Sequence, residues 1–334
     1  MSKPNEVDVW ALSDLTTPWA LRVVATLRLA DLIAAGNSHI EDLAGNAKVD
    51  ADSLQRVLRH LIGQGVFEEP APGSFALNEA AEMLRDDHPS RLRIGLDLDA
   101  FGNRMAFAWG SLLSAVRSGK PAYEEIFGLP FWEDLDAHPE IAASFDDLMG
   151  SAGHGVPGPQ VLVNSDWDSV QVVADVGGGN GTLLAEILKA RPETRGILVD
   201  LPRTVACSDE IFSAAGVADR VTTIGQSFFD PLPAGADLYL LKNLLDDWAD
   251  PEARAILQRC AEAARPNGRV VIIGGVSPDK DGGGGNPALL MMVLVGGRNR
   301  SLSEFRELAR EAGLEVSAAG RQESGKYVVE CRPV

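Results

Sequence analysis

Apolar residues recur at helical spacing through the first part of the chain. The segment 20–35, ALRVVATLRLADLIAA, predicts one amphipathic helix, and Gly36 can end it as a C-cap. A second, short helix is expected around 40–44. The chain therefore begins with a helical region that has an apolar face to bury.

The next apolar pattern predicts a third helix and a β-hairpin. Asp50 or Asp52 can cap this helix, which is expected to end near Gly63 or Gly65. Two short apolar runs then flank the turn residues 70–73, PAPG, which is a hairpin signal. Three helices followed by a hairpin is the order of a winged helix. Winged helices bind DNA, but they also serve as dimer platforms.

The segment 100–155 predicts helices that are rich in aromatic and methionine side chains. Most of these side chains are expected in the core, and a subset can line an apolar ligand pocket. The stretch 150–159, GSAGHGVPGP, is typical of a loop and indicates a boundary.

From residue 170 onward, short β-branched runs alternate with helical stretches. This alternation predicts an α/β domain with a doubly wound parallel sheet. The glycine-rich insertion 279–287 is typical of a flexible loop. The expected strands are 171–177, 195–202, 221–225, 236–243, 268–276, 315–320 and 327–333, and the expected helices are 182–192, 206–215, 251–266 and 301–314.

The charge balance narrows the choice of partners. Asp and Glu number 48 against 30 Lys and Arg, so the formal net charge is −18. Such a field repels phosphate backbones and anionic membranes, so neither a nucleic acid nor a membrane is expected as a partner. The helix that would read DNA offers only Arg56, Arg59 and His60. A winged-helix regulator that senses a small molecule is kept as a non-enzymatic interpretation, beside the enzyme interpretations given below.

Cysteine usage indicates the compartment. Cys207, Cys260 and Cys331 form no C-x-x-C pair, so neither a disulfide framework nor a metal site is expected. The first residues do not have the pattern of a signal peptide, and no run of about 18 apolar residues occurs. We therefore expect a reducing, cytoplasmic location.

The segment 174–182, ADVGGGNGT, is the most informative about chemistry, because it follows a predicted strand and opens a predicted helix. Its glycines allow a tight turn and a close approach of the backbone to a ligand beside the helix N-terminus. A dinucleotide fingerprint would need glycine where Thr182 stands, and the Gly-Lys-Ser/Thr of a P-loop is absent. Asp200 ends the next strand and can accept both hydroxyls of a ribose. The pattern favours an adenosyl ligand with an amino-acid tail over a pyrophosphate.

Five segments together resemble the small-molecule O-methyltransferases that use S-adenosyl-L-methionine, in the manner of actinobacterial enzymes that tailor aromatic polyketide antibiotics. They are DVGGGNG (175–181), LVDLPRTV (198–205), SFFDPLP (227–233), LLKNLLDDW (240–248) and ARPNGRVVIIG (264–274). The resemblance implies a winged-helix-like dimerisation domain at 1–95, a helical linker at 96–154 that contributes to the substrate pocket, and a Rossmann-like cofactor domain at 155–334. It also implies a homodimer, with the acceptor bound between the two domains.

By position, the resemblance assigns the cofactor site. The glycines frame the methionine part, Asp200 holds the ribose, and Trp248 packs near the adenine. The family has Asp-Phe where this chain has Ser227-Phe228, so a hydroxyl replaces a carboxylate there. The implied cofactor-binding residues are Asp175, Gly177, Gly179, Gly181, Asp200, Leu201, Ser227, Phe228, Lys242 and Trp248.

The catalytic position departs from the family pattern. The family reads Lys-x-x-Leu-His-Asp-Trp with histidine as general base, whereas 242–248 is KNLLDDW and Asp246 replaces the histidine. An exposed carboxylate, with a pKa of about 3.9, is a much weaker base for a phenol than an imidazole. Burial, or the charge of Asp247 next to it, can raise that pKa.

Three outcomes are open for the acceptor proton. Asp246 accepts it or orients the hydroxyl, with alignment providing most of the acceleration. Alternatively, water or His154 takes it, since His154 lies in a stretch where the family often places pocket residues. In the third outcome, methyl transfer is lost and the protein performs another tailoring reaction such as hydroxylation, as some relatives do.

The acceptor pocket is predicted to be apolar, which suits a flat aromatic acceptor better than a sugar. The segment 289–292, LLMM, resembles the family segment that packs over the acceptor. The candidate pocket residues are Met105, Trp109, Phe127, Trp132, Phe145, Met149, Asn243, Met291 and Met292. The leading interpretation is an S-adenosylmethionine-dependent O-methyltransferase that acts on an aromatic hydroxyl in antibiotic biosynthesis.

Overall fold

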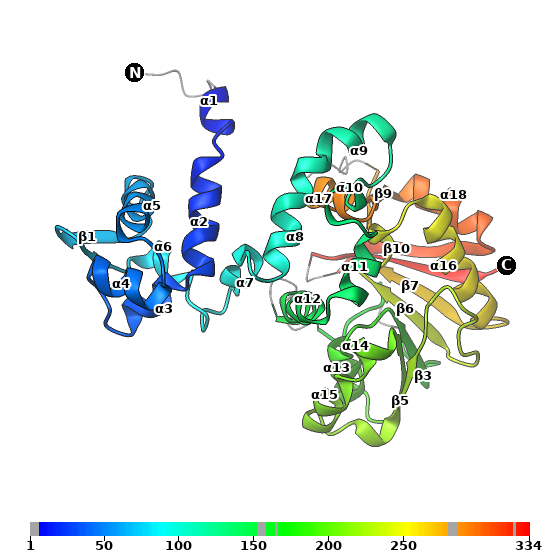
Figure 1. The fold of residues 1–334 in the computed structure, drawn as a ribbon. Coiled ribbons are helices and arrows are strands. Elements are labelled where there is room, and N and C mark those ends of the chain that lie inside the picture. Colours follow the sequence, from blue (N-terminus) through cyan, green and yellow to red (C-terminus); the bar gives the residue numbers. More distant parts are fainter. Residues whose placement is uncertain (1–6, 152–157, 164–165, 280–285, 323–324) are drawn as a thin grey trace. The chain divides into compact units, whose positions relative to one another are not determined.

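The computed structural model describes residues 7–151, 158–163, 166–279, 286–322 and 325–334. The chain divides into two compact units (Figure 1), one comprising 1–107 and 135–153 and the other 108–134 and 154–334. The segment 96–154 therefore contributes to both units. The domain boundaries near 95 and 155 that the resemblance implies stay predictions.

The first unit begins with a winged-helix-like arrangement, as the apolar pattern predicts. Its elements are α1 (Val9–Leu12), α2 (Thr16–Thr26), α3 (Leu29–Ala34), α4 (Ile40–Ala47), α5 (Ala51–Gly63), β1 (Glu68–Ala71), β2 (Ser74–Ala76), α6 (Glu79–Glu82), α7 (Leu92–Leu96), α8 (Phe101–Ala108) and α12 (Pro139–Ser151). Helix α5 buries Leu54, Leu58 and Leu61 along one face. Asp50 caps this helix by accepting the Ser53 N–H at 2.8 Å. The hairpin β1–β2 follows directly.

The prediction of a single helix over 20–35 is wrong, because the structure has two helices there, α2 and α3. Arg28 separates them with a left-handed backbone, at a φ of 53°. This change of direction lets α3 bury Leu29 and Ala30. A left-handed arginine is rare, so composition carries no signal for the break. Gly36 follows the end of α3, where its φ of 97° suits a glycine.

The helices predicted over 100–155 are confirmed. Besides α8 and α12 they are the 3₁₀ turn η1 (Trp109–Ser111), α9 (Leu112–Ser118), α10 (Glu124–Phe127) and α11 (Phe131–Ala137). Helix α12 reaches Ser151, so the predicted loop 150–159 begins inside a helix. Residues 152–157, which include His154, lie outside the described residues.

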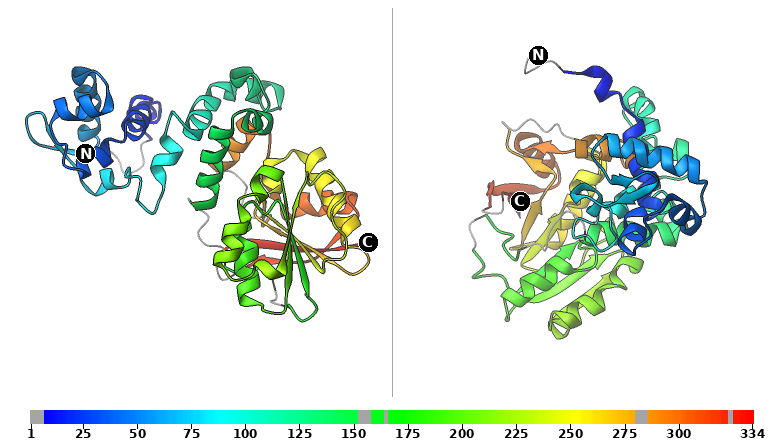
Figure 2. Two further views of the ribbon diagram at one scale, coloured as in Figure 1. Left: turned by 60° about the horizontal axis from the view of Figure 1, so that its bottom comes forward. Right: turned by 90° about the vertical axis from the view of Figure 1, so that its left-hand side faces the viewer.

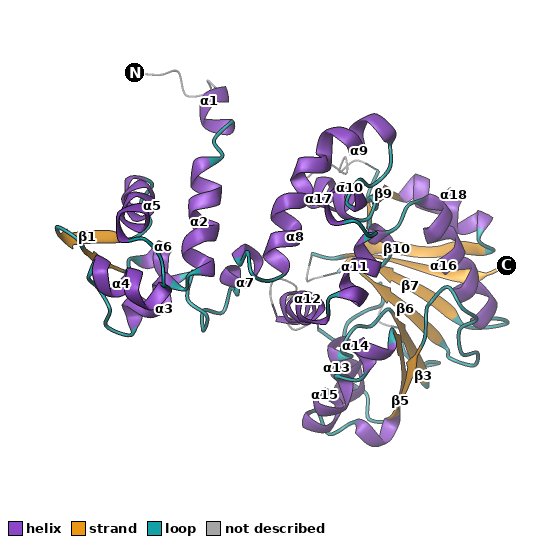
Figure 3. Cartoon of the chain, viewed as in Figure 1, coloured by secondary structure: helices purple, strands orange, loops and turns teal. Residues whose placement is uncertain are grey.

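The second unit is built on a seven-stranded sheet (Figure 3) with the strand order β10-β11-β7-β6-β3-β4-β5. Each predicted strand is present, and the doubly wound α/β fold is confirmed. The strands are β3 (Val172–Val176), β4 (Arg195–Asp200), β5 (Val221–Gly225), β6 (Leu238–Lys242), β7 (Arg269–Ile273), β10 (Leu314–Arg321) and β11 (Tyr327–Pro333). A separate short pair joins β8 (Val276–Ser277) to β9 (Arg300–Ser301).

The sheet is mixed, whereas a wholly parallel sheet was predicted. Strand β11 pairs antiparallel with both β7 and β10. The connection between β10 and β11 is too short to contain a crossover helix, which a parallel pair needs. Strand β11 therefore follows β10 through a short connection and runs antiparallel to it.

Helices cover both faces of the sheet (Figure 2). The apolar core on one face is shared with α13 (Thr182–Ala190) and α15 (Ser208–Ala214), and the core on the other face with α16 (Asp250–Ala263) and α18 (Leu302–Glu311). Successive side chains of a strand point to opposite faces of the sheet and pack into the two cores. In β3, Val173 therefore packs on one side and Ala174 on the other. Burial on both faces explains why these strands read as nearly continuous apolar runs.

Two details of this unit differ from the prediction. The helix expected at 206–215 is confirmed as α15 (Ser208–Ala214), but the expected strand 195–202 ends at Asp200 and the short helix α14 (Pro202–Val205) follows it. Pro202 begins α14, because proline fits the first turn of a helix. Part of the loop expected at 279–287 is helical, since Asn286 opens α17 (Asn286–Leu294). Residues 280–285 lie outside the described residues.

Two observations concern membranes and thiols. Of the helices in the described ranges, none has the length and apolar character that a membrane crossing requires. Cys260 and Cys331 are buried free thiols, and Cys207 is an exposed one.

Candidate functional site

The candidate site lies at the carboxyl edge of the sheet, where four parallel strands lie in the order β6-β3-β4-β5. Lys242 ends β6, Asp175 lies next to the end of β3, and Asp200 ends β4. The chain passes from β3 to β4 on one side and later returns to β6 on the other, which makes a topological switch point. Ligands of open α/β sheets bind outside the carboxyl ends of the strands at such a point.

The turn from β3 into α13 requires its glycines. Gly177, Gly179 and Gly181 have φ of 66°, 61° and 84°, a region that favours residues without a Cβ. A Cβ on Gly178 would lie 2.6 Å from the Asp175 Cγ, so space excludes a side chain there as well. The turn therefore presents bare, half-buried backbone next to the N-terminus of α13, as the sequence predicts.

Asp200 joins the glycine turn to the next strand. Its carboxylate accepts the Gly179 N–H at 2.8 Å on one oxygen and the Leu201 N–H at 2.7 Å on the other. Burial raises the pKa of Asp200, and these two hydrogen bonds lower it. Each carboxylate oxygen accepts more than one hydrogen bond, so both oxygens keep capacity for a vicinal pair of hydroxyls.

Asp175 packs against this turn and is only 1% exposed. Its Oδ2 has no hydrogen-bond partner among the described residues. Burial raises the pKa of Asp175 to about 7, while Lys242 lowers it and Asp200 raises it. The carboxyl group therefore changes charge near neutral pH.

This burial gives a stability prediction for Asp175→Asn. The carboxyl ionises near 3.8 in the unfolded chain and near 7 in the folded one, so its contribution to stability is complete below pH 3.8 and is lost as the pH rises to about 7. Asparagine does not titrate, so the variant should gain about 4 kcal/mol relative to the wild type over this window. Urea unfolding between about pH 4 and pH 8 measures the difference. The matched control, exposed Asp209→Asn, should not show this trend, and a pH-independent difference for Asp175→Asn would contradict the prediction.

A strained residue follows strand β6. Asn243 has a left-handed backbone with a φ of 51°, and its N–H donates to the Ile273 carbonyl at 2.8 Å. A Cβ on Gly274 would lie 3.3 Å from the Asn243 Cγ, so the glycine makes room for this side chain. A left-handed non-glycine residue costs about 1–3 kcal/mol. Here it redirects the chain from β6 toward the turn that carries Asp246.

Asp246 and Asp247 lie in the short turn η3 (Leu245–Asp247). Asp246 is half-buried, and the charges of Lys242 and Arg300 both interact favourably with it. The pKa of Asp247 is raised well above its ordinary value by burial and by the charge of Asp246. Nearby cations thus favour the charged form of Asp246, while burial and the charge of Asp246 favour the neutral form of Asp247.

Trp248 lies in an aromatic cluster. The ring centroids of Phe228 and Phe229 are 5.8 and 4.9 Å from it, both edge-on, and Trp132 stacks on it at 6.1 Å. The Trp248 indole N–H is buried without a hydrogen-bond partner among the described residues. Ser227 supports the cluster by accepting the Phe229 N–H at 3.2 Å. The sequence reasoning missed Phe229, although SFFDPLP shows it directly after Phe228.

Three candidate acceptor-pocket residues lie in the first unit. Phe145 on α12 packs edge-on against Phe101, with centroids 4.9 Å apart, so it contributes to packing within this unit. Met105 is half-buried on α8, and Met149 is exposed on α12. Their role toward an acceptor stays a prediction.

The other six pocket candidates lie in the second unit. Trp132 and Asn243 adjoin the turn η3 and Trp248, as described above. Phe127 on α10 packs against the Tyr123 ring at 4.4 Å. The turn η1 contacts both α10 and α17. On these elements lie Trp109, Phe127, Met291 and Met292, so the four residues belong to helices that contact one another through η1.

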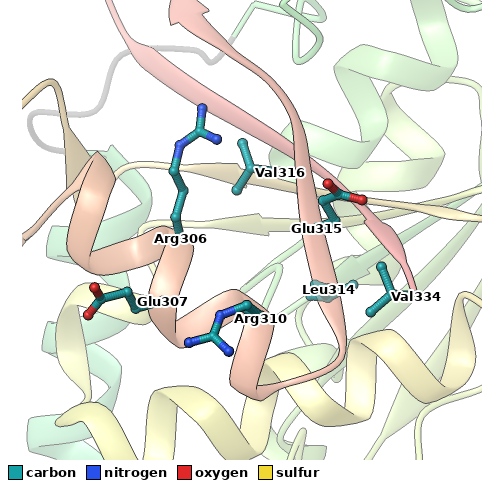
Figure 4. Close-up of a pocket in the computed structure, with 7 residues that line it drawn as sticks. All are labelled: Arg306, Glu307, Arg310, Leu314, Glu315, Val316 and Val334. Atoms are coloured by element: carbon teal, nitrogen blue, oxygen red, sulfur yellow. The ribbon is translucent and has the colours of Figure 1, made fainter.

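A surface groove of about 400 Å³ lies between α18 and β10 (Figure 4) and contains no predicted site residue. Its lining residues are Arg306, Glu307, Arg310, Leu314, Glu315, Val316 and Val334. Over the described parts of the chain, no group of three or more His, Cys, Asp or Glu side chains is arranged to hold a metal ion.

Comparison with protein families gives two matches. Residues 109–315 match the model of the O-methyltransferase domain, and residues 10–87 match that of the O-methyltransferase dimerisation domain. The second match supports a homodimer.

Individual relatives match nearly the whole chain. A 2,7-dihydroxy-5-methyl-1-naphthoate 7-O-methyltransferase from Streptomyces carzinostaticus is 43% identical over 92% of this chain and 92% of its own length. An aclacinomycin 10-hydroxylase from Streptomyces purpurascens is 39% identical over 92% of this chain and 83% of its own. The crystal structure of an O-methyltransferase from neocarzinostatin biosynthesis, in complex with S-adenosylmethionine and 2-hydroxy-5-methyl naphthoic acid, matches with a TM-score of 0.91 and 41% identity, covering 98% of this chain and 99% of that one.

Proposed function

The chain belongs to the O-methyltransferase family, and from that premise we propose that it transfers the methyl group of S-adenosyl-L-methionine to a hydroxyl of an aromatic, naphthoate-type compound in antibiotic biosynthesis. One observation carries the proposal. The glycine turn and Asp200 are joined at the sheet edge of a chain that is 43% identical to a naphthoate O-methyltransferase. The solved relative in complex with S-adenosylmethionine and a naphthoic acid supports an aromatic acceptor.

The residues at the sheet edge fit an S-adenosyl ligand. Such a ligand needs acceptors for two ribose hydroxyls, bare backbone for its amino-acid tail and an aromatic surface for its adenine. Asp200, the turn 177–181 and the Trp248–Phe228 pair provide these three features. The Oδ2 of Asp175 and the indole N–H of Trp248 are buried and lack a hydrogen-bond partner within the part of the chain that the structure describes, so such a ligand, or water around it, can satisfy them. Leu201, Ser227 and Lys242 complete the proposed cofactor site.

We assign the proton of the acceptor hydroxyl to Asp246. S-adenosylmethionine supplies a methyl group that its positive sulfur makes electrophilic. The carboxylate of Asp246 accepts the hydrogen bond of the acceptor hydroxyl and receives its proton as the oxygen is methylated. Lys242 and Arg300 favour the charged form of Asp246 that this step requires. A carboxylate is a weak base for a phenol, so alignment of the hydroxyl supplies much of the acceleration.

Labelled cofactor tests the proposed function. The protein is incubated with methyl-labelled S-adenosylmethionine and a panel of hydroxylated naphthoates and anthracyclines, and products are analysed by mass spectrometry. We expect at least one acceptor to gain the label and one CH₂ unit. If the cofactor binds but no acceptor in the panel is methylated, the methyl-transfer proposal is wrong.

Tailoring without methyl transfer is a second candidate function. Asp246 stands where the family has histidine, and one close relative is an aclacinomycin 10-hydroxylase. The same incubation, run in air with an added thiol reductant, separates the two functions. Hydroxylation would take one oxygen atom from dioxygen, with two electrons from the thiol reducing the other to water, and would leave the label on the cofactor.

The dimerisation domain leads to a prediction about α1. Trp10 and Leu12 on this helix are 88% and 76% exposed, and large exposed apolar side chains gathered in one place mark a protein contact. Replacing both by serine is expected to raise the Kd of the homodimer at least about 10-fold, since burying one such side chain contributes about 1.5–3 kcal/mol. Sedimentation velocity measures the change, and Val334→Ser at the exposed C-terminus is the control. A double variant that dimerises as tightly as the wild type would show that α1 lies outside the dimer contact.

We also propose a cytoplasmic location. Support comes from the three free thiols of Cys207, Cys260 and Cys331, which suit a reducing compartment.

A further inference from the structure

Arg300 has a buried guanidinium group whose hydrogen bonds do more than its charge, which favours ionised Asp246, requires. It begins strand β9 and is only 1% exposed. Its Nη1 donates to the Leu245 carbonyl and its Nη2 to the Trp248 carbonyl, each at 2.8 Å, and its Nε donates to Asp250 Oδ1 at 2.9 Å. One planar cation thus joins the carbonyls at both ends of the turn that contains Asp246.

Removing the Arg300 cation from water costs free energy, so the stability of the fold does not by itself account for a buried arginine here. Desolvation lowers the pKa of Arg300, and the carboxylate of Asp250 raises it. A hydrophobic side chain of similar volume often stabilises a protein as well as a buried ion pair does. Fixed geometry is the property that the ion pair adds, because the guanidinium fork holds its acceptors in defined directions.

Two glycines bring neighbouring backbone against the same turn. A Cβ on Gly297 would overlap the Asp246 carbonyl oxygen and lie 2.6 Å from the Asp247 carbonyl carbon. A Cβ on Gly275, whose φ is 71°, would lie 3.1 Å from the Asp246 N. The two glycine segments are tied together, since the Arg300 N–H donates to the Gly275 carbonyl at 2.9 Å. Asp246 is therefore enclosed by backbone that admits no side chain.

We infer that Arg300 is a positioning residue, which holds the turn 245–248 so that Asp246 and Trp248 face the reaction with fixed geometry. This inference rests on the proposed methyl transfer. Arg300 acts through the backbone of the turn and through its charge, and it touches no reacting atom. Asp250, at the start of α16, assists Arg300, because its carboxylate orients the guanidinium group.

The charge of Arg300 adds a readout that a purely structural arginine would lack. The charged groups that interact with Asp246 include Lys242, Arg300 and the neighbouring Asp247. Loss of the Arg300 cation makes ionisation of Asp246 less favourable. The acidic limb of the pH–rate profile should therefore move to higher pH when Arg300 is replaced by a neutral residue.

The test compares Arg300→Met with Arg298→Gln. Arg298 bonds to the same Asp250 at 2.9 Å and to Glu304 at 2.8 Å, and its side chain donates to no carbonyl of the turn. For Arg300→Met we expect kcat to fall about 10- to 100-fold, as for a small misplacement of a catalytic group, with a smaller change in the acceptor KM. Arg298→Gln should keep kcat within about 3-fold of the wild type.

Hydrogen exchange of the ligand-free protein gives a readout without activity. Peptides covering 244–249 should exchange faster in Arg300→Met than in the wild type or Arg298→Gln. If Arg300→Met does not fold, Arg300→Lys is measured in its place. Its ammonium keeps the charge but cannot bridge both carbonyls in the same plane. This variant should then show the kcat loss and faster exchange without the shift of the acidic limb.

Unchanged exchange at 244–249 together with unchanged kcat in the Arg300 variant would overturn the inference. Failure of the proposed function is a separate result, since a wild-type protein that methylates no acceptor can still show the exchange difference.

Discussion

Replacing Asp200 by alanine is expected to lower the affinity for S-adenosylhomocysteine about 10³-fold. The Asp200 carboxylate ends β4 and already fixes the glycine turn through the Gly179 N–H. We propose that its remaining acceptor capacity binds the two ribose hydroxyls. Hydrogen bonds to a charged group contribute about 2 kcal/mol each, so losing two of them costs about 4 kcal/mol, or three powers of ten in Kd.

Isothermal titration calorimetry with S-adenosylhomocysteine measures this loss. Asp200→Asn keeps the shape but loses the charge and one acceptor, so an intermediate loss is expected. Asp209→Ala, on the exposed surface of α15, is the matched control and should bind as the wild type does. An Asp200→Ala variant that binds within about 3-fold of the wild type would remove Asp200 from the ribose site.

Replacing Asp246 by asparagine is expected to lower kcat about 10³-fold. General-base assistance contributes about 10²- to 10⁴-fold, and asparagine keeps the shape of the side chain but cannot take the proton. The wild-type rate should fall at low pH, because the protonated carboxyl cannot accept the acceptor proton. Asp246→Asn should lack this acidic limb, so the pH–rate profile and kcat together measure the role.

Two further variants sharpen this experiment. Asp246→His restores the family residue and should give an active enzyme whose acidic limb lies near the imidazole pKa, about 6.5. Asp247→Asn is the matched control, because it removes the neighbouring carboxyl of the same turn, to which the proposed reaction gives no role. Its kcat should stay within about 3-fold of the wild type. If Asp246→Asn retains full turnover, the proton goes elsewhere, and His154→Ala is the next variant to measure.

The pattern of apolar positions predicted most of the fold because most of its elements are locally encoded. Helix α5 combines a periodic apolar face with the cap of Asp50, and the strands of the second unit combine β-branched runs with clear turn residues. The break at Arg28 and the antiparallel strand β11 were missed. Each depends on what the segment packs against or pairs with, and neither leaves a mark in its own composition.

The candidate site divides in the same way. The glycine turn and Asp200 could be located from the sequence, because a left-handed φ and a strand end leave recognisable residues at fixed places. The resemblance placed Asp246 at the catalytic position but could not give its surroundings. Burial decides that Asp247 favours the neutral form, while Lys242 and Arg300 favour the charged form of Asp246.

The sequence by itself determined the α/β class, the glycine turn at the end of β3, the acid at the end of β4 and the departure at Asp246. These features arise from neighbours along the chain, where backbone geometry restricts the residue type directly. Only the tertiary structure decided that Arg300 lies against the carbonyls of Leu245 and Trp248, more than fifty positions before it. Such a contact is selected by burial and by hydrogen-bond satisfaction between distant segments, and neither is written in the local pattern of either segment.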